Sequence, residues 1–247
     1  MSRKLGKKKA RFDSRTLMMA KYLIKELPTP PSVINFGDKV SNWGMYLNDQ
    51  IGDCTIAASA HLILQWTANT NGVAGIGDND ILAAYEAITG YNPNDPNTDQ
   101  GAVELDVLKY WQNSGIASHK IGAFVALDPQ NINHLKASVY LFGGSYIGIA
   151  LPISAQNQDI WDLPIEGASG DGSPGSWGGH AVEVCGYDEN YIYIVTWGAI
   201  KKMTYAFWLA YCDEAYAIIS NDFLVGNKTI EGFDIDTLNM DLNLVKG

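Results

Sequence analysis

The residues best suited to covalent chemistry in this chain are Cys54 and His180. Gly52 and Asp53 interrupt the chain just before Cys54, and a run of good helix formers follows. We therefore expect Cys54 at a helix N-terminus, where partial positive charge lowers the pKa of a thiol and favours the nucleophilic thiolate. His180 opens a predicted strand directly after a glycine-rich loop, a position suited to a general base and acid.

A third polar residue, Gln50, lies four residues before Cys54. Its side-chain amide, together with a backbone N–H at the helix start, is the candidate donor to an oxyanion. His61 lies two helical turns after Cys54, ~10 Å along the axis, and is therefore predicted to pack in the core instead of acting as the base. Cys185 and Cys212 are also interpreted as packing residues.

The apolar patterns divide the chain into a helical first half and a strand-rich second half. Helical spacing is predicted at 16–27, 54–68, 81–89, 103–114 and 131–141. Strands are predicted at 145–151, 180–185 and 191–196, with a glycine-rich surface loop at 166–179. This segregation predicts an α+β fold, in which the first half contributes a buried helix that begins at Cys54 and the second half an antiparallel sheet.

The composition is that of an ordinary globular chain. Hydrophobic residues make up 47% and charged residues 18%, which excludes a disordered or collagen-like chain. The apolar stretches fall short of the ~20 residues of a membrane helix, so no membrane contact is expected. Three cysteines without metal-ligand spacing predict no disulfide framework, no metal and no cofactor, and indicate a cytoplasmic location.

Positive charge is concentrated in the first 25 residues, which hold nine Lys and Arg against the single acid Asp13. Their charge of +8 leaves −18 for the rest of a chain whose net charge is −10. We expect three parts: a basic arm at 1–27, a folded domain at 28–226 and a C-terminal tail at 227–247. The arm, from Arg3 to Arg15, is either a solubilising tail or a segment that docks on nucleic acid or a protein assembly.

Taken in order, several motifs resemble the papain-like cysteine peptidases. They span roughly residues 28–219, and the most specific is a His-Ala-Val strand followed by Gly-Tyr, a short turn, a second strand and Trp-Gly. The stretches that carry the resemblance are Gln50-Ile-Gly-Asp-Cys54, His180-Ala-Val-Glu-Val-Cys-Gly-Tyr187 and Asn190-Tyr-Ile-Tyr-Ile-Val-Thr-Trp-Gly198. The chain is also similar to uncharacterised proteins of phages and prophages.

The resemblance implies a two-lobed fold, with Cys54 as nucleophile, His180 as base and acid, and Gln50 as oxyanion donor. The chain departs from the family in its short gap between Gln50 and Cys54. It also has Val195 and Thr196 where the family has Asn or Asp, and only the Thr196 hydroxyl can accept a hydrogen bond from an imidazole. Two functions follow: a thiol hydrolase acting on peptide or protein substrates, or a weak or silent structural protein, with a place in the host cytoplasm or a virus particle.

Overall fold

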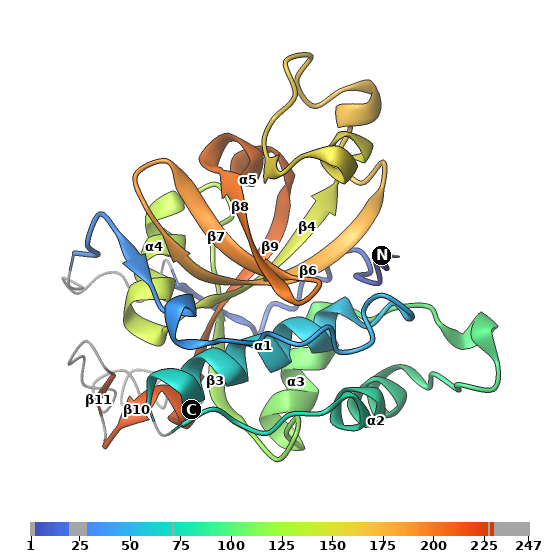
Figure 1. Ribbon diagram of the computed structural model, residues 1–247, viewed down its shortest axis with the longest axis vertical. Coiled ribbons are helices and arrows are strands. Elements are labelled where there is room, and N and C mark those ends of the chain that lie inside the picture. Colours follow the sequence, from blue (N-terminus) through green and yellow to red (C-terminus); the bar gives the residue numbers. More distant parts are fainter. Residues whose placement is uncertain (1–2, 20–28, 71, 227, 230–247) are drawn as a thin grey trace.

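The computed structural model describes residues 3–19, 29–70, 72–226 and 228–229. Helices α1, α2 and α3 form the lower part of the molecule in Figure 1, and a strongly curved sheet forms the upper part. The helices are α1 (Cys54–Asn69), α2 (Asp78–Thr89), α3 (Glu104–Asn113), α4 (Ile132–Phe142) and α5 (Tyr205–Tyr211). The mixed α+β architecture expected from the sequence is therefore confirmed.

One large sheet has the strand order β1-β3-β9-β4-β6-β7-β8-β5, with β2 paired to β6. Its neighbours are antiparallel except for the pairs β1–β3 and β5–β8. The strands are β1 (Leu17–Met18), β2 (Ile34–Asn35), β3 (Ile121–Ala126), β4 (Ser145–Leu151), β5 (Ile160–Trp161), β6 (Gly178–Tyr187), β7 (Tyr191–Thr196), β8 (Ala199–Thr204) and β9 (Cys212–Ser220). A small hairpin, β10 (Leu224–Val225) with β11 (Lys228–Thr229), lies apart from it.

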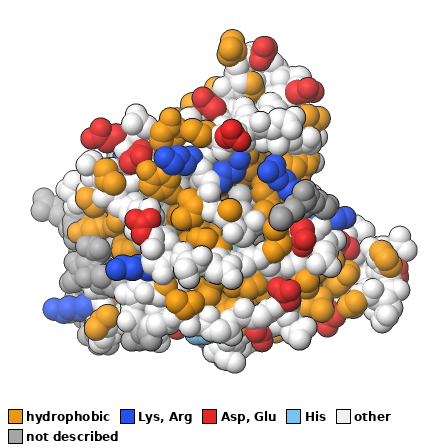
Figure 2. Space-filling model, viewed as in Figure 1, with side chains coloured by type: hydrophobic (Ala, Val, Ile, Leu, Met, Phe, Trp, Pro, Cys, Tyr) orange, Lys and Arg blue, Asp and Glu red, His pale blue; other side chains and the backbone are white. Residues whose placement is uncertain are grey.

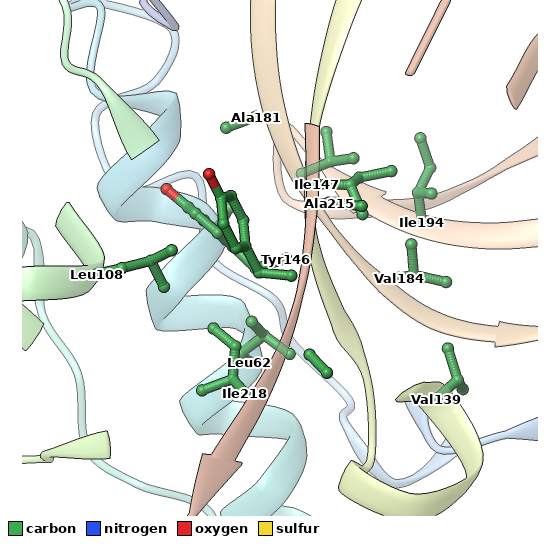
Figure 3. Packing of buried hydrophobic residues seen from close by; sticks show 14 of the residues in the cluster. Leu62, Leu108, Val139, Tyr146, Ile147, Ala181, Val184, Ile194, Ala215 and Ile218 are labelled. Carbon is green, nitrogen blue, oxygen red and sulfur yellow. The ribbon is translucent and has the colours of Figure 1, made fainter. Parts of the chain in front are cut away.

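Helix α1 is the buried centre of the fold, as its almost wholly apolar sequence predicts. Every residue from Cys54 to Thr67 is buried. Leu62 of α1 and Leu108 of α3 lie on one side of the sheet with Tyr146 of β4, and Ile147 lies on the other side (Figure 3). The Tyr146 hydroxyl donates to the Thr55 carbonyl oxygen at 2.9 Å, which fixes α1 to the sheet. Burial of each large apolar side chain here contributes about 1.5–3 kcal/mol.

The segment predicted as a helix at 16–27 differs in the structure. Leu17 and Met18 form β1, which adds to the sheet beside Val125 and Ala126 of β3. The ladder bonds of a free sheet edge outweigh a short helical pattern here, because a single helical turn is costly to nucleate. Residues 20–28 lie outside the described part of the chain.

Within the described residues, no helix is long and apolar enough to cross a membrane. Among the same residues, no three His, Cys, Asp or Glu side chains are grouped so that they could hold a metal ion.

Candidate active site

Cys54 is the first residue of α1, and its sulfur lies against strand β6. The side chain is buried, and its Sγ accepts a hydrogen bond from the Ala181 N–H at 3.5 Å. Burial raises the pKa of Cys54 to about 12, although the backbone N–H groups of Ala181 and Gly6 act in the opposite direction. The thiol is therefore protonated in this state.

His180, the neighbour of Ala181, is buried in β6. Its Nε2 lies 2.7 Å from the Thr196 Oγ1 at the end of β7. Its Nδ1 is buried and has no hydrogen-bond partner among the described residues. Burial lowers the pKa of His180 to about 3, so the imidazole is neutral. An imidazole that donates from Nε2 keeps Nδ1 as a lone-pair acceptor, which is the form a general base requires.

Trp197 covers the bond between His180 and Thr196. Its ring stacks on the imidazole, with centroids 4.5 Å apart and planes at 13°. Trp197 has a φ of 47°, a left-handed conformation that costs a non-glycine residue about 1–2 kcal/mol. The strained backbone places a flat apolar surface over the imidazole, and water is excluded from the hydrogen bond beneath it. The Asp188 carboxylate, in the turn before β7, accepts hydrogen bonds from the Tyr193 hydroxyl and from the backbone N–H groups of Asn190 and Tyr191. It is therefore engaged within its own turn.

The turn before Cys54 places Gln50 differently from Asn48. Gln50 is exposed, and no hydrogen bond of its side chain is found among the described residues. Asn48 is buried, and its side-chain amide donates to the Asp53 carboxyl at 3.1 Å. The Asp99 carboxylate accepts from the Gly52 N–H at 3.0 Å and so fixes the same turn to the loop before α3. The roles of Asn48 and Asp99 had no signal in the sequence, since both lie in ordinary turn-forming stretches.

Residues 6–8 of the basic arm lie against Cys54, in the space between Ala102 before α3 and Gly179 of β6, here named the cleft. The Lys7 N–H donates to the Gly179 carbonyl at 3.1 Å, and the Lys8 N–H donates to the Ala102 carbonyl at 2.8 Å. In turn, the Ala102 N–H donates to the Gly6 carbonyl at 2.8 Å. Gly6 allows this approach, because a Cβ there would lie 1.7 Å from the Gly52 carbonyl oxygen. The arm therefore bridges the helical part and the sheet, and it shields the thiol from solvent.

The Lys7 side chain enters a pocket formed by Glu104, Asp213 and Glu214, here named the acidic pocket. Its Nζ lies 2.9 Å from the Asp213 carboxylate and 3.0 Å from that of Glu214. Burial opposes the charge of Lys7, but the three carboxylates outweigh it and raise its pKa. The sequence analysis did not single out these four residues, because they are distant in sequence and match no motif.

A hollow of about 940 Å³ opens beside Thr196 and Trp197. Its lining includes Arg3, Trp177, Trp197, Lys201 and Lys202. In Figure 2, Lys and Arg side chains are seen across the middle of the molecule, below the projecting loops. Arg3 lies over the Trp197 ring at 5.0 Å and so extends the arm along this wall.

Neither a family model nor a curated protein sequence matches the chain. Solved structures do. Xylellain, a cysteine protease from Xylella fastidiosa, is 17% identical with a TM-score of 0.66, over 89% of this chain and 98% of that one. Procathepsin L 3 from Tenebrio molitor larval midgut is 12% identical with a TM-score of 0.61, over 88% and 76%. Procathepsin B S9 from Trypanosoma congolense is 13% identical with a TM-score of 0.59, over 88% and 87%. The chain therefore has the papain-like fold.

Proposed function

We propose that this papain-like chain is a thiol peptidase that hydrolyses amide bonds through Cys54. The observation that carries the proposal is the contact between the Cys54 sulfur, at the head of a buried helix, and the strand whose His180 is held by Thr196. A nucleophile, a base and a residue that orients the base are the parts that such chemistry needs.

In the proposed reaction, His180 takes the thiol proton and the Cys54 sulfur attacks the carbonyl carbon of the substrate. The N–H groups that begin α1, which have no partner within the helix, and the Gln50 amide would donate to the oxyanion. Collapse breaks the C–N bond, and the amine leaves with the proton from His180. Water, activated by the same imidazole, then hydrolyses the thioester and regenerates the thiol.

The arm makes the described state a latent one. It covers Cys54, and its Gly6 N–H faces the sulfur, so the arm presents an amide proton to the nucleophile. A nucleophile needs a carbonyl carbon, which explains why the arm is not itself a substrate in this pose. The pKa of about 12 for Cys54 would fall once water reaches the sulfur, because burial is its main cause.

The alternative is a catalytically silent structural protein of the same fold. Its support is Thr196, whose hydroxyl orients the imidazole but carries no charge to stabilise an imidazolium. Docking of the arm on nucleic acid or a protein assembly would first require it to leave the cleft. Lys7, Arg11 and Arg15 already have acidic partners within this chain. A virion or cytoplasmic location remains a prediction of the sequence.

Iodoacetamide labelling tests the proposal on the full chain. All three cysteines are free and buried, so Cys185 and Cys212 are internal standards. In a Lys7→Ala variant, whose arm has lost its buried ion pairs, we expect Cys54 to be alkylated at least tenfold faster than the other two. We also expect the variant to hydrolyse peptide amides, and the double variant Lys7→Ala/Cys54→Ala to be inactive.

Equal labelling of the three thiols, with no hydrolysis of a mixed peptide library, would favour the silent structural protein. The Lys109→Ala variant is the matched control, because it removes a lysine from a more exposed ion pair with Asp13 that lies outside the cleft. It should label like the parent chain.

A further inference from the structure

The acidic pocket gathers three carboxyl groups around a single ammonium group. One ammonium group, that of Lys7, faces the carboxyl groups of Glu104, Asp213 and Glu214. Glu104 is fully buried, and neither of its carboxyl oxygens has a hydrogen-bond partner among the described residues. Glu214 is also buried, and the Tyr216 hydroxyl donates to it at 2.9 Å. Burial raises the pKa of Glu104 and of Glu214, because a buried carboxylate without compensation is costly, and the Lys7 ammonium acts on both in the opposite direction. The pocket therefore favours a cation as its occupant.

Strand β4 is shaped to admit a long, unbranched side chain. Gly148 stands at the wall of the pocket, where a Cβ would lie 1.9 Å from the Lys7 Cε, 2.8 Å from the Glu214 Cγ and 2.9 Å from the Glu104 Oε1. Any larger residue at this position would close the pocket. The missing side chain leaves the space through which the lysine stem passes.

The backbone groups that hold residues 6–8 of the arm could form the same hydrogen bonds with any extended peptide. They are the Gly179 carbonyl on the sheet side and the Ala102 N–H and carbonyl on the helical side. Such bonds do not depend on side-chain identity, so a peptide that replaced the arm would be held alike and would direct one side chain into the pocket. Gly6, next to Lys7, lies at the Cys54 sulfur, so this side chain would belong to a residue close to the bond under attack.

We propose that the acidic pocket is the specificity site of the enzyme and binds a lysine or arginine side chain of the substrate within two residues of the cleaved bond. Lys7 occupies the site in the latent state. The cleavage preference rests on the proposed peptidase function, whereas binding of a basic side chain does not. An apolar side chain of equal length would leave two buried carboxyl groups without a counter-charge, and a preference of at least 100-fold for the basic residue is expected.

The binding half is tested by chemical rescue in the full chain. Lys7→Ala leaves a space the size of the missing stem and ammonium, which n-butylammonium would fill. We expect 20 mM n-butylamine hydrochloride at pH 7.5 to raise the Tm of this variant by about 3 °C or more, relative to 20 mM KCl. n-Butanol, which has the same length without the charge, should give less than a third of that shift.

Two matched variants assign the effect to the pocket. Lys7→Ala/Gly148→Ala adds a methyl group where the stem would pass and should abolish the rescue, while Lys109→Ala should show none. If Lys7→Ala alone does not fold, Lys7→Ala/Glu104→Gln removes one uncompensated carboxyl group and should retain a smaller rescue. Equal shifts with butanol and butylamine, or no shift in either folded variant, would overturn the proposal.

The cleavage half uses two peptide amides that differ only in lysine or norleucine at the position beside the scissile bond. With Lys7→Ala we expect kcat/KM to favour lysine by at least 100-fold, and Glu214→Gln in the same background to reduce that ratio at least tenfold. Hydrolysis of both peptides at equal rates would overturn the specificity proposal and leave the peptidase function standing. Rescue by butylamine without any hydrolysis would support the binding site and contradict the peptidase function.

Discussion

Cys54 and the acidic pocket both contact the arm, yet burial affects the charges at the Cys54 and His180 site and in the pocket in opposite ways. At Cys54 and His180, burial leaves both side chains neutral, with a pKa of about 12 for the thiol and about 3 for the imidazole. In the acidic pocket, the ammonium of Lys7 keeps its charge because acidic side chains are buried beside it. Burial keeps the proposed nucleophile and base neutral, and a side chain of the same chain fills the pocket.

This difference separates reactivity from recognition. The proposed base, His180, is oriented by a neutral hydrogen bond to Thr196, whereas the pocket depends on the charge of Lys7. A change in the arm should therefore affect both regions, and a change in either region alone should leave the other intact. Four predictions test this separation, beginning with the largest expected effect.

Loss of the Lys7 charge should have the largest effect on stability. Lys7→Met keeps the length of the side chain but leaves Glu104 and Glu214 without a counter-ion, and we expect the free energy of unfolding to fall by about 3 kcal/mol. Urea denaturation measures it. The control Lys109→Met, in a more exposed pair, should lose less than about 1 kcal/mol. A loss in Lys7→Met no larger than in that control would show that the pocket does not need its cation.

Thr196→Val should act on the catalytic pair alone. The substitution keeps the shape of the side chain and removes the acceptor for the His180 Nε2, so we expect kcat to fall roughly 10- to 100-fold with KM unchanged. Peptide hydrolysis in the Lys7→Ala background measures the two constants. Thr196→Ser should restore most of the activity. An unchanged kcat would remove Thr196 from the catalytic arrangement.

Acid should destabilise the fold through its buried, neutral histidines. Burial lowers the pKa of His61 to about 4 and that of His180 to about 3, from 6.5. Below pH 6.5 the unfolded chain binds more protons, so their stabilisation is complete above that pH and is lost as the pH falls toward 3. At pH 5 the loss is about 2 kcal/mol for each histidine.

Urea denaturation at pH 7 and pH 5 measures this loss. His61→Gln removes the histidine of the two that is not a proposed catalytic residue. It should reduce the difference between the free energies of unfolding at pH 7 and pH 5 by about half of the contribution of His61 and His180. An identical pH dependence in the variant and the parent chain would mean that His61 is protonated in the folded state.

Gln50→Ala should have the smallest effect. The side chain is exposed, so any bond to an oxyanion competes with water, and we expect kcat to fall no more than about tenfold. Hydrolysis rates in the Lys7→Ala background measure it. A loss above 100-fold would mean that Gln50 turns into the cleft when substrate binds.

The sequence was informative where local patterns match local structure. The apolar run after Cys54 predicted α1, and the His-Ala-Val and Thr-Trp-Gly motifs placed His180 and Thr196 on β6 and β7, where they meet. Those residues lie near the outer ends of adjacent strands joined by a short turn. Their separation in sequence is therefore enough to predict that they lie side by side.

The arm and the acidic pocket were beyond reach of the same approach. Lys7 and Asp213 are 206 residues apart, and their contact depends on long-range packing that no local pattern encodes. Charge alone indicated a free arm, because a lysine-rich segment is usually solvated. Strands β3 and β9 were missed in the same way, since they pair with each other across the whole second half of the chain.

Strand β1 has a consequence for how the cleft opens. The arm is attached to the body through Lys7 in the acidic pocket and, further along the chain, through Leu17 beside Val125 in the sheet. Departure from the pocket alone leaves the segment tethered within about ten residues, at an effective concentration in the millimolar range. A competing peptide in solution must exceed that concentration to hold the cleft open. A cut in the chain between the two attachments would abolish this advantage, whereas a cut after β1 would preserve it.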